Sequence, residues 1–177
     1  MAFRMSDAAQ AVDVVVGESL ETLFRAHYAR LVRALAVVSG SQESAADAVQ
    51  EAFVKAHLHW RKIQRYDDPV GWIRRVAINK LRDDHRRRGR KEKAVERLHG
   101  EFRPDQHDWS DGVDITSLLA DLPKQQRLAM ALFYVNGLSV AEVAASLEIS
   151  EGAVKFHLHQ GRERLRSVFA ARAEVEQ

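Results

Sequence analysis

Residues 137–165 constrain this chain most strongly, because they encode two short helices joined by a tight turn. Gly137 is suited to ending a preceding helix, and Ser139 followed by Glu142 forms the S-x-x-E pattern of a capping box. Apolar residues at helical spacing follow, and a second N-cap stands at Ser150. This arrangement predicts a helix-turn-helix, a motif whose second helix enters the DNA major groove. An ordinary helical hairpin is the alternative; the match of caps, turn and apolar positions favours DNA contact.

A helical wheel divides the second helix into a packing side and a side that faces DNA. At about 100° per residue the packing side collects Val154, Leu158, Gly161 and Leu165. The candidate DNA-reading residues of the other side are Gly152, Lys155, Phe156, His159 and Gln160. Only Lys155 among them brings a full positive charge, so we expect this helix to read DNA weakly unless the protein is held in place by other contacts.

Composition excludes several classes of protein. The 177 residues, 46% of them hydrophobic, suffice for one domain or two small ones. The chain has no cysteine, which excludes disulfides and thiolate metal sites and fits a reducing cytoplasm. Its eight histidines form no ligand cluster, and the common catalytic and nucleotide-binding motifs are absent. We therefore expect no catalytic residues, no metal and no cofactor. The first 17 residues resemble neither a signal peptide nor a membrane span, so we expect no membrane insertion.

The formal net charge of +2 conceals a strong asymmetry along the chain. Between Trp72 and Lys93 there are ten Lys or Arg and three acidic residues, a surplus of seven, so the remainder carries 2 − 7 = −5. A basic surplus of this size favours a polyanionic partner, because neutralised phosphates release counterions. A solvated basic surface is the alternative interpretation.

The apolar spacing predicts an all-α protein of two small helical domains joined by a flexible linker, the C-terminal one a helix-turn-helix. Helices are expected over 19–38, from about Ala45 to Trp60, from Pro69 to about Arg88, and from Pro123 to about Asn136. The predicted organisation is an N-terminal extension (1–18), a first domain (19–88), an acidic linker punctuated by glycine and proline (89–112) and a second domain (113–177).

The helix predicted to begin at Pro69 carries a second nucleic-acid signal. Beside an apolar stripe, one face combines an aromatic ring, an amide and three guanidinium groups: Trp72, Arg75, Asn79, Arg82 and Arg86. Such a face suits stacking on bases and contact with phosphates, as in single-strand binding. The alternative is that Trp72 belongs to the core and the arginines only face solvent.

Six segments together resemble a bacterial RNA polymerase sigma factor of the extracytoplasmic function (ECF) group. They are residues 47–56, 69–80, 122–127, 137–144, 150–155 and 162–166. The resemblance covers about residues 18–169 and keeps the family's order of motifs, which makes it more specific than any single motif. It implies a promoter-melting domain and an upstream-element domain, without catalysis of their own.

The resemblance implies a role for each group of candidate residues. Asp47, Gln50 and Glu51 would bind the clamp helices of the polymerase's largest subunit, although a solvated helix face is the alternative for these residues alone. Trp72, Arg75, Asn79, Arg82 and Arg86 would bind and open the −10 element, with a base captured outside the stack. The helix of residues 151–163 would read the −35 element. The other implied partners are the β flap of the polymerase and an anti-sigma factor.

The chain departs from the family pattern at Phe156 and Gln160, where relatives commonly carry a small polar residue and an arginine. We therefore expect weak binding of the −35 element by the second domain alone. A stand-alone helix-turn-helix regulator is the alternative function, but it would leave the motifs over 47–79 unexplained. A nucleic-acid enzyme is a further alternative, against which the absence of an acidic cluster or metal site argues.

Overall fold

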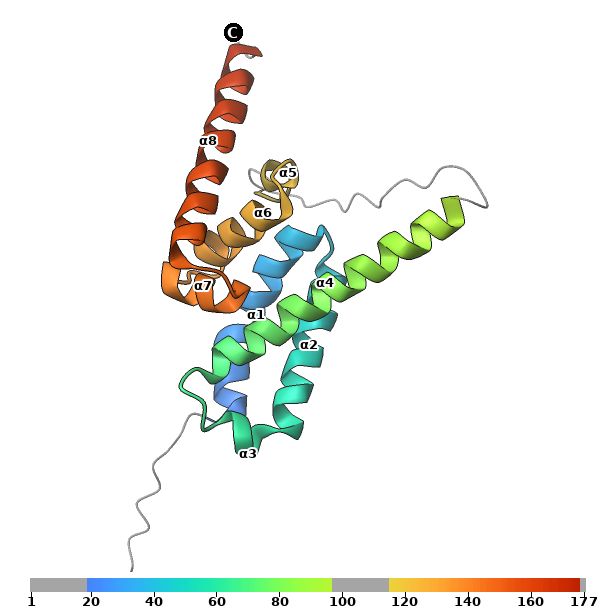
Figure 1. Cartoon of the computed structure of the whole chain (residues 1–177), viewed down its shortest axis with the longest axis vertical. Coiled ribbons are helices and arrows are strands. Elements are labelled where there is room, and N and C mark those ends of the chain that lie inside the picture. Colours follow the sequence, from blue (N-terminus) through green and yellow to red (C-terminus); the bar gives the residue numbers. More distant parts are fainter. Residues whose placement is uncertain (1–18, 97–114, 176–177) are drawn as a thin grey trace, which may run out of the picture.

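The computed structural model describes residues 19–96 and 115–175, and all regular elements in these ranges are helical (Figure 1). The first domain consists of α1 (Leu20–Ser39), α2 (Gln42–Leu58), α3 (Trp60–Ile63) and α4 (Pro69–Glu96). The second consists of α5 (Ile115–Ala120), α6 (Lys124–Met130), the π-helical η1 (Ala131–Val135), α7 (Val140–Leu147) and α8 (Glu151–Val175). The all-α prediction is confirmed. The predicted N-terminal extension and residues 97–112 of the predicted linker lie outside the described residues.

The ends of α1 follow from local chemistry. The Ser19 hydroxyl accepts a hydrogen bond from the backbone N–H of Thr22 at 3.1 Å, which satisfies a donor of the first turn. At the other end Gly40 adopts φ 70°, and its N–H donates to the carbonyl of Ala36 at 2.8 Å. Glycine adopts this left-handed backbone conformation at little cost in free energy, because it has no Cβ. The helix therefore ends close to the position that the sequence predicts.

The structure corrects two helix boundaries. Trp60, predicted to end the second helix, instead opens the short α3, because α2 stops at Leu58. The third helix continues eight residues past Arg88 to Glu96, so residues 89–96 of the predicted linker are helical. One glycine within a helix costs only about 1 kcal/mol, and the residues after Gly89 are mostly good helix formers such as Arg, Lys and Glu.

The helix predicted from Pro123 to about Asn136 is present, with a change of hydrogen bonding at its end. Regular α6 passes into η1, where the N–H of Asn136 donates to the carbonyl of Ala131, five residues back, at 3.0 Å. Gly137, with φ 73°, then turns the chain toward α7. The preceding short α5 was not predicted from the sequence.

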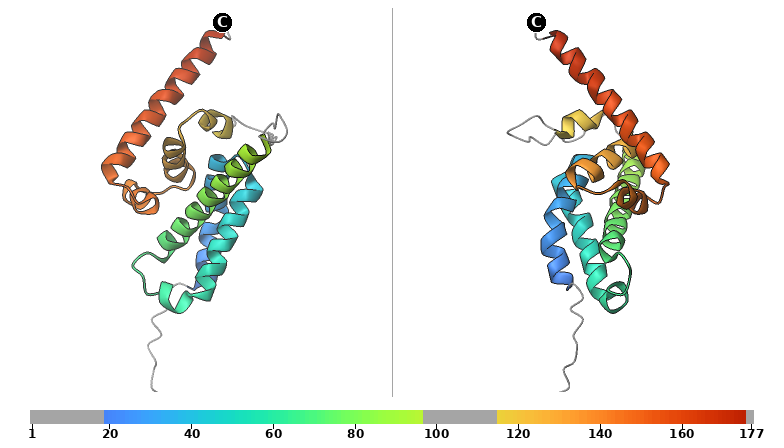
Figure 2. Two further views of the ribbon diagram at one scale, coloured as in Figure 1. Left: turned by 45° about the vertical axis from the view of Figure 1, so that its right-hand side comes forward. Right: turned by 90° about the vertical axis from the view of Figure 1, so that its left-hand side faces the viewer.

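Apolar packing joins the two domains. Within the first domain α1 and α4 both pack on α2, and within the second α8 packs on α6 and α7. Between the domains, α5 and η1 pack on α1, and α7 packs on α4 (Figure 2). A single hydrophobic cluster therefore runs from Leu35 and Val49 in the first domain to Leu132 and Val143 in the second. The far end of α8 projects away from the first domain (Figures 1 and 2).

Candidate nucleic-acid interface

The helix-turn-helix of residues 137–165 is capped as the sequence predicts. The Ser139 hydroxyl accepts from the N–H of Glu142 at 3.2 Å, and the Glu142 carboxylate accepts from the N–H of Ser139 at 2.8 Å. Hydrogen bonds that the N–H and the hydroxyl of Ser139 donate to the Glu142 carboxylate lower its pKa. Glu148 ends α7 with φ 58°, and Ser150 caps α8 by accepting from the N–H of Ala153 at 3.1 Å. These contacts define the start and the end of α7 and the start of α8.

The described side chains of α8 agree with the predicted wheel. Val154, Leu158 and Gly161 are buried and Leu165 is half-buried. On the opposite side Gly152, Lys155, Phe156 and His159 are exposed. The Phe156 ring is 58% exposed, a large apolar surface to leave in water. Gln160 is half-buried, which places it at the edge of the exposed side rather than at its centre.

A close approach between α6 and α8 fixes the recognition helix on its support. A Cβ atom at Gly161 would lie 2.9 Å from Cγ and Sδ of Met130. Glycine therefore lets the two helices pack more closely than a larger residue would. The exposed side of α8 is thereby held on a rigid base.

The start of α4 is a compact polar junction built on Asp68. One carboxylate oxygen of Asp68 accepts from the N–H of Gly71 at 2.7 Å and so caps the helix. The other accepts from a terminal nitrogen of Arg74 at 3.1 Å. The loop before α4 is thus tied to the first turns of this helix.

Arg74 links the start of α4 to the second domain, a contact that the sequence did not predict. Its side chain is 4% exposed, and its Nε donates to the hydroxyl of Ser146 in α7 at 3.2 Å. Ser146 in turn donates to the carbonyl of Glu142 at 2.7 Å. Burial lowers the pKa of Arg74, and the negative charges of Asp68 and Glu142 oppose that shift. A sequence signal existed: Arg74 lies one helical turn before the buried Ile78, on the wide packing side of α4.

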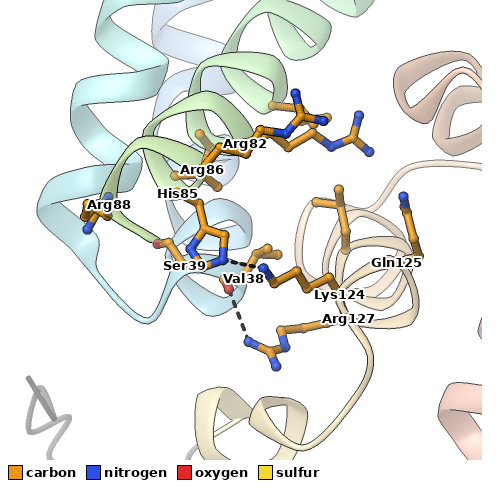
Figure 3. A pocket seen from close by; sticks show the side chains of 12 residues that line it. Val38, Ser39, Arg82, His85, Arg86, Arg88, Lys124, Gln125 and Arg127 are labelled. Atoms are coloured by element: carbon orange, nitrogen blue, oxygen red, sulfur yellow. Dashed lines mark hydrogen bonds between the residues drawn. The ribbon is translucent and has the colours of Figure 1, made fainter. Parts of the chain in front are cut away.

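The structure only partly gathers the five predicted residues of α4 on an open surface. Asn79 and Arg86 are exposed, whereas Arg75 and Arg82 are half-buried. Trp72 is also half-buried and packs against the hydrophobic core, so one part of its ring is unavailable for stacking. Arg82 and Arg86 line a cavity between α4 and α6 (Figure 3).

The acidic side of α2 combines free and paired groups. Asp47 and Gln50 are exposed. Glu51 forms ion pairs with Lys55 at 2.8 Å and with Lys80 of α4 at 2.9 Å. Hydrogen bonds from Lys55 and Lys80 lower the pKa of Glu51, and hydrogen bonds to Glu51 and Asp84 raise the pKa of Lys80. Glu51 therefore helps to hold α2 against α4.

Neither a metal-binding cluster nor a membrane-spanning helix occurs in residues 19–96 and 115–175. No group of three or more His, Cys, Asp or Glu side chains in these ranges is placed to hold a metal ion. No helix in them has both the length and the apolar character needed to cross a bilayer.

Comparison with protein-family models identifies both domains. Residues 23–91 match sigma-70 region 2, and residues 113–165 match sigma-70 region 4. The first match contains α2, α3 and the part of α4 up to residue 91, and the second contains the helix-turn-helix.

Similar curated proteins extend the match over most of the chain. The ECF RNA polymerase sigma factor SigE of Mycolicibacterium smegmatis is 35% identical over 86% of this chain. The chain covers 62% of SigE, less than two thirds of its length. The ECF sigma factor SigF of Caulobacter vibrioides is 34% identical, and the match covers 70% of this chain and 69% of SigF. The ECF sigma factor SigM of Mycobacterium tuberculosis is 30% identical, and the match covers 90% of this chain and 83% of SigM.

Solved structures share the fold. CnrH, in complex with the cytosolic domain of CnrY, matches with a TM-score of 0.58 and 28% identity over 86% of this chain and 88% of that one. The sigma factor RpoE of Bartonella quintana, in complex with the anti-sigma factor NepR, matches in fold with a TM-score of 0.66 and 23% identity over 85% and 94%. With both sigma-70 regions present in order and relatives at 30% identity or more, the chain belongs to the ECF family of RNA polymerase sigma factors.

Proposed function

We propose that this protein binds core RNA polymerase and directs it to promoters by recognising a −35 and a −10 element. The observation that carries this proposal is the pairing of two surfaces in one chain of the sigma family. One is the exposed side of a capped and supported recognition helix, α8, and the other is the aromatic and cationic face of α4.

In this proposal the second domain reads the −35 element through Gly152, Lys155, Phe156, His159 and Gln160. The exposed Phe156 ring contacts thymine methyl groups, and Lys155 supplies the charge for a phosphate or a guanine. Because Phe156 cannot donate a hydrogen bond and Gln160 is half-buried, the intrinsic affinity is low. Attachment to the polymerase raises the effective concentration of the domain at its site.

The first domain opens the −10 element through Trp72, Arg75, Asn79, Arg82 and Arg86. The exposed amide of Asn79 is suited to hydrogen-bonding the edge of an unstacked base. The accessible part of Trp72 offers a stacking surface, and the guanidinium groups contact phosphates. The junction of Asp68 and Gly71 holds the preceding loop at the start of this face.

We assign polymerase binding to the acidic side of α2 and to the second domain. Asp47 and Gln50 are exposed and contact the clamp helices of the largest subunit, and Glu51 contributes from its ion-paired position. The second domain contacts the β flap. The protein works in the cytoplasm, without catalysis of its own, and an anti-sigma factor controls it, by analogy with the solved complex of RpoE with the anti-sigma factor NepR.

Reconstitution with purified core polymerase tests the proposal. The full chain should form a stable complex with core and start transcription from promoters selected from a random DNA library. A folded protein that binds DNA but no bacterial core would instead be a stand-alone helix-turn-helix regulator.

Asp47→Ala tests the polymerase contact directly. It should weaken core binding while changing the free energy of unfolding by about 0.5 kcal/mol or less, because Asp47 is exposed. Glu21→Ala, which removes an exposed acid of α1, is the matched control and should bind core like the wild type.

A further inference from the structure

A cavity of about 330 Å³ lies between the two domains, where the middle of α4 faces the first turn of α6 (Figure 3). This volume is within the range of small-molecule sites, about 300–1,000 Å³. Its basic lining residues are Arg82, His85, Arg86, Arg88, Lys124 and Arg127, and none of the described residues that line it is Asp or Glu. Cations therefore face the cavity from both domains.

Among the described residues, the arginine and lysine side chains of this lining have few acidic partners. Arg86 pairs with Asp83 at 3.6 Å, and Arg88 donates to the neutral hydroxyl of Ser44 at 2.9 Å. Within residues 19–90 and 118–170, Arg82 and Lys124 form no ion pair with a carboxylate. The cavity thus carries an excess of positive charge in a partly enclosed space, where screening by water is reduced.

The α6 side of the cavity shows the same shortage of acceptors. Lys124 Nζ contacts His85 Nε2, and since an ammonium has no acceptor, the imidazole nitrogen must accept this hydrogen bond (Figure 3). Arg127 donates to the backbone carbonyls of Val38 at 3.4 Å and Leu122 at 3.1 Å, while its buried Nε has no hydrogen-bond partner. Lys124 and Arg127 thus donate to neutral acceptors, and the nearby negative charge of Asp121 opposes the lowering of the Arg127 pKa by burial.

We propose that this pocket binds the polyphosphate group of a small phosphorylated ligand, such as a nucleoside triphosphate, and that the ligand bridges the two domains. Several charged oxygens on one small group match cations placed on opposite walls. Arginine binds phosphate oxygens in bidentate geometry and lysine as a point charge, so α4 and α6 supply complementary contacts. This inference goes beyond the proposed function, because the binding requires neither polymerase nor DNA.

One consequence rests on the proposed function. Arg82 and Arg86 line this pocket and are also assigned to the −10 element. A bound polyphosphate would occupy them and would hold α6 beside α4. The ligand would then compete with promoter opening.

Calorimetric titration of the full-length chain with inorganic tripolyphosphate tests the site, with no other macromolecule present. We expect saturable binding at one site per chain, and about tenfold weaker binding for inorganic phosphate, which offers fewer charge-assisted contacts. ATP is the second probe. Tighter binding of ATP than of tripolyphosphate would assign the site to a nucleotide, and equal binding would assign it to the polyphosphate group alone.

Single substitutions on each wall locate the ligand. Arg82→Gln on α4 and Lys124→Gln on α6 should each weaken tripolyphosphate binding by about tenfold, the loss of one charge-assisted contact. Gln125→Glu, which places a carboxylate at the pocket, should weaken it further. Arg164→Gln is the control, because it removes an exposed cation of α8 that does not line the pocket.

Three results would overturn the proposal. They are no saturable binding of tripolyphosphate, equal weakening by Arg164→Gln and Lys124→Gln, and weakening by the α4 variant alone. The last would place the ligand on α4 without a bridge to α6. Lys124→Gln is expected to fold normally because Lys124 is exposed, and circular dichroism would verify this. Absence of tripolyphosphate binding would not affect the test of binding to core polymerase, so the two proposals can be rejected independently.

Discussion

Arg74 of α4 and Ser146 of α7 form a buried hydrogen bond between the two domains, with Nε of the arginine 3.2 Å from the serine hydroxyl. The same guanidinium group pairs with Asp68 in the loop before α4. One side chain therefore connects the loop before α4 with the first helix of the helix-turn-helix. Separation of the domains would leave this polar group to find new partners in water.

Ser146→Ala should loosen the packing of the two domains. The substitution leaves Arg74 Nε without an acceptor in the packed arrangement, at a cost of about 1–3 kcal/mol. Small-angle scattering should report a larger radius of gyration for the free protein. Ser167→Ala on the exposed part of α8 is the control, and identical scattering from both variants would contradict a role for this hydrogen bond.

Gly71→Ala should destabilise the protein although alanine normally favours a helix. A Cβ at this position would lie 1.9 Å from a carboxylate oxygen of Asp68, so the carboxylate would have to leave both the helix cap and Arg74. We expect a net loss of about 1–2 kcal/mol in the free energy of unfolding, in the range of a lost cap.

Gly89→Ala provides the matched control, because a Cβ there meets nothing within 4 Å. It should stabilise α4 by up to about 1 kcal/mol. Urea denaturation of both variants compares their free energies of unfolding. An increase for Gly71→Ala would show that the Asp68 carboxylate can move away without destabilising the protein.

Glu51→Gln should change stability in a pH-dependent way. Since the folded-state pKa of Glu51 is lowered from 4.5, its stabilisation is present above that pH and is lost as the pH falls through the lowered value. Lys80, whose folded-state pKa is raised above 10.5, contributes below that pH and loses its contribution at higher pH. At pH 7 we expect the free energy of unfolding of the wild type to exceed that of Glu51→Gln by a few tenths to about 1 kcal/mol, as for other ion pairs screened by solvent. A difference in urea denaturation that stays constant from pH 7 to pH 3 would contradict this assignment.

Asn79→Ala should impair promoter opening more than promoter binding. The exposed amide of Asn79 is assigned to an unstacked base, which exists only after melting. Closed complexes in gel-shift assays should persist, while permanganate-reactive thymines near −10 should decrease. Equal loss of both signals would remove Asn79 from the melting step.

Gln160→Arg should strengthen binding of the −35 element and steepen its salt dependence. An arginine at this edge position of α8 can reach a phosphate, adding roughly one phosphate contact to the slope of log affinity against log salt. Titration of the −35 duplex at several salt concentrations measures both effects. An unchanged slope would mean that position 160 does not face the DNA backbone.

The elements that the sequence predicts well depend on neighbouring residues. The capping box of Ser139 and Glu142, the helix expected over 19–38 and the packing side of α8 all arise from contacts within a few positions, and the structure contains each of them. The six-residue α5 escaped detection because so short a segment shows little periodicity.

The relation between the domains could not be predicted from spacing. Arg74 and Ser146 are 72 positions apart, and the charge of Arg74 suggests exposure rather than burial. Periodicity identifies an apolar side of a helix but not the partner that covers it. The assigned contacts with DNA and polymerase stay predictions, because they form only when these partners bind.

The hydrophobic cluster shared by α1, α4, η1 and α7 has a thermodynamic consequence for the transcription cycle. Any conformer in which the domains stand apart exposes apolar side chains, so only a small fraction of free molecules would adopt it. The apparent affinity for a polymerase that requires separated domains is reduced to that fraction of its intrinsic value. A molecule that leaves the polymerase would re-form its cluster and so would compete poorly for immediate rebinding.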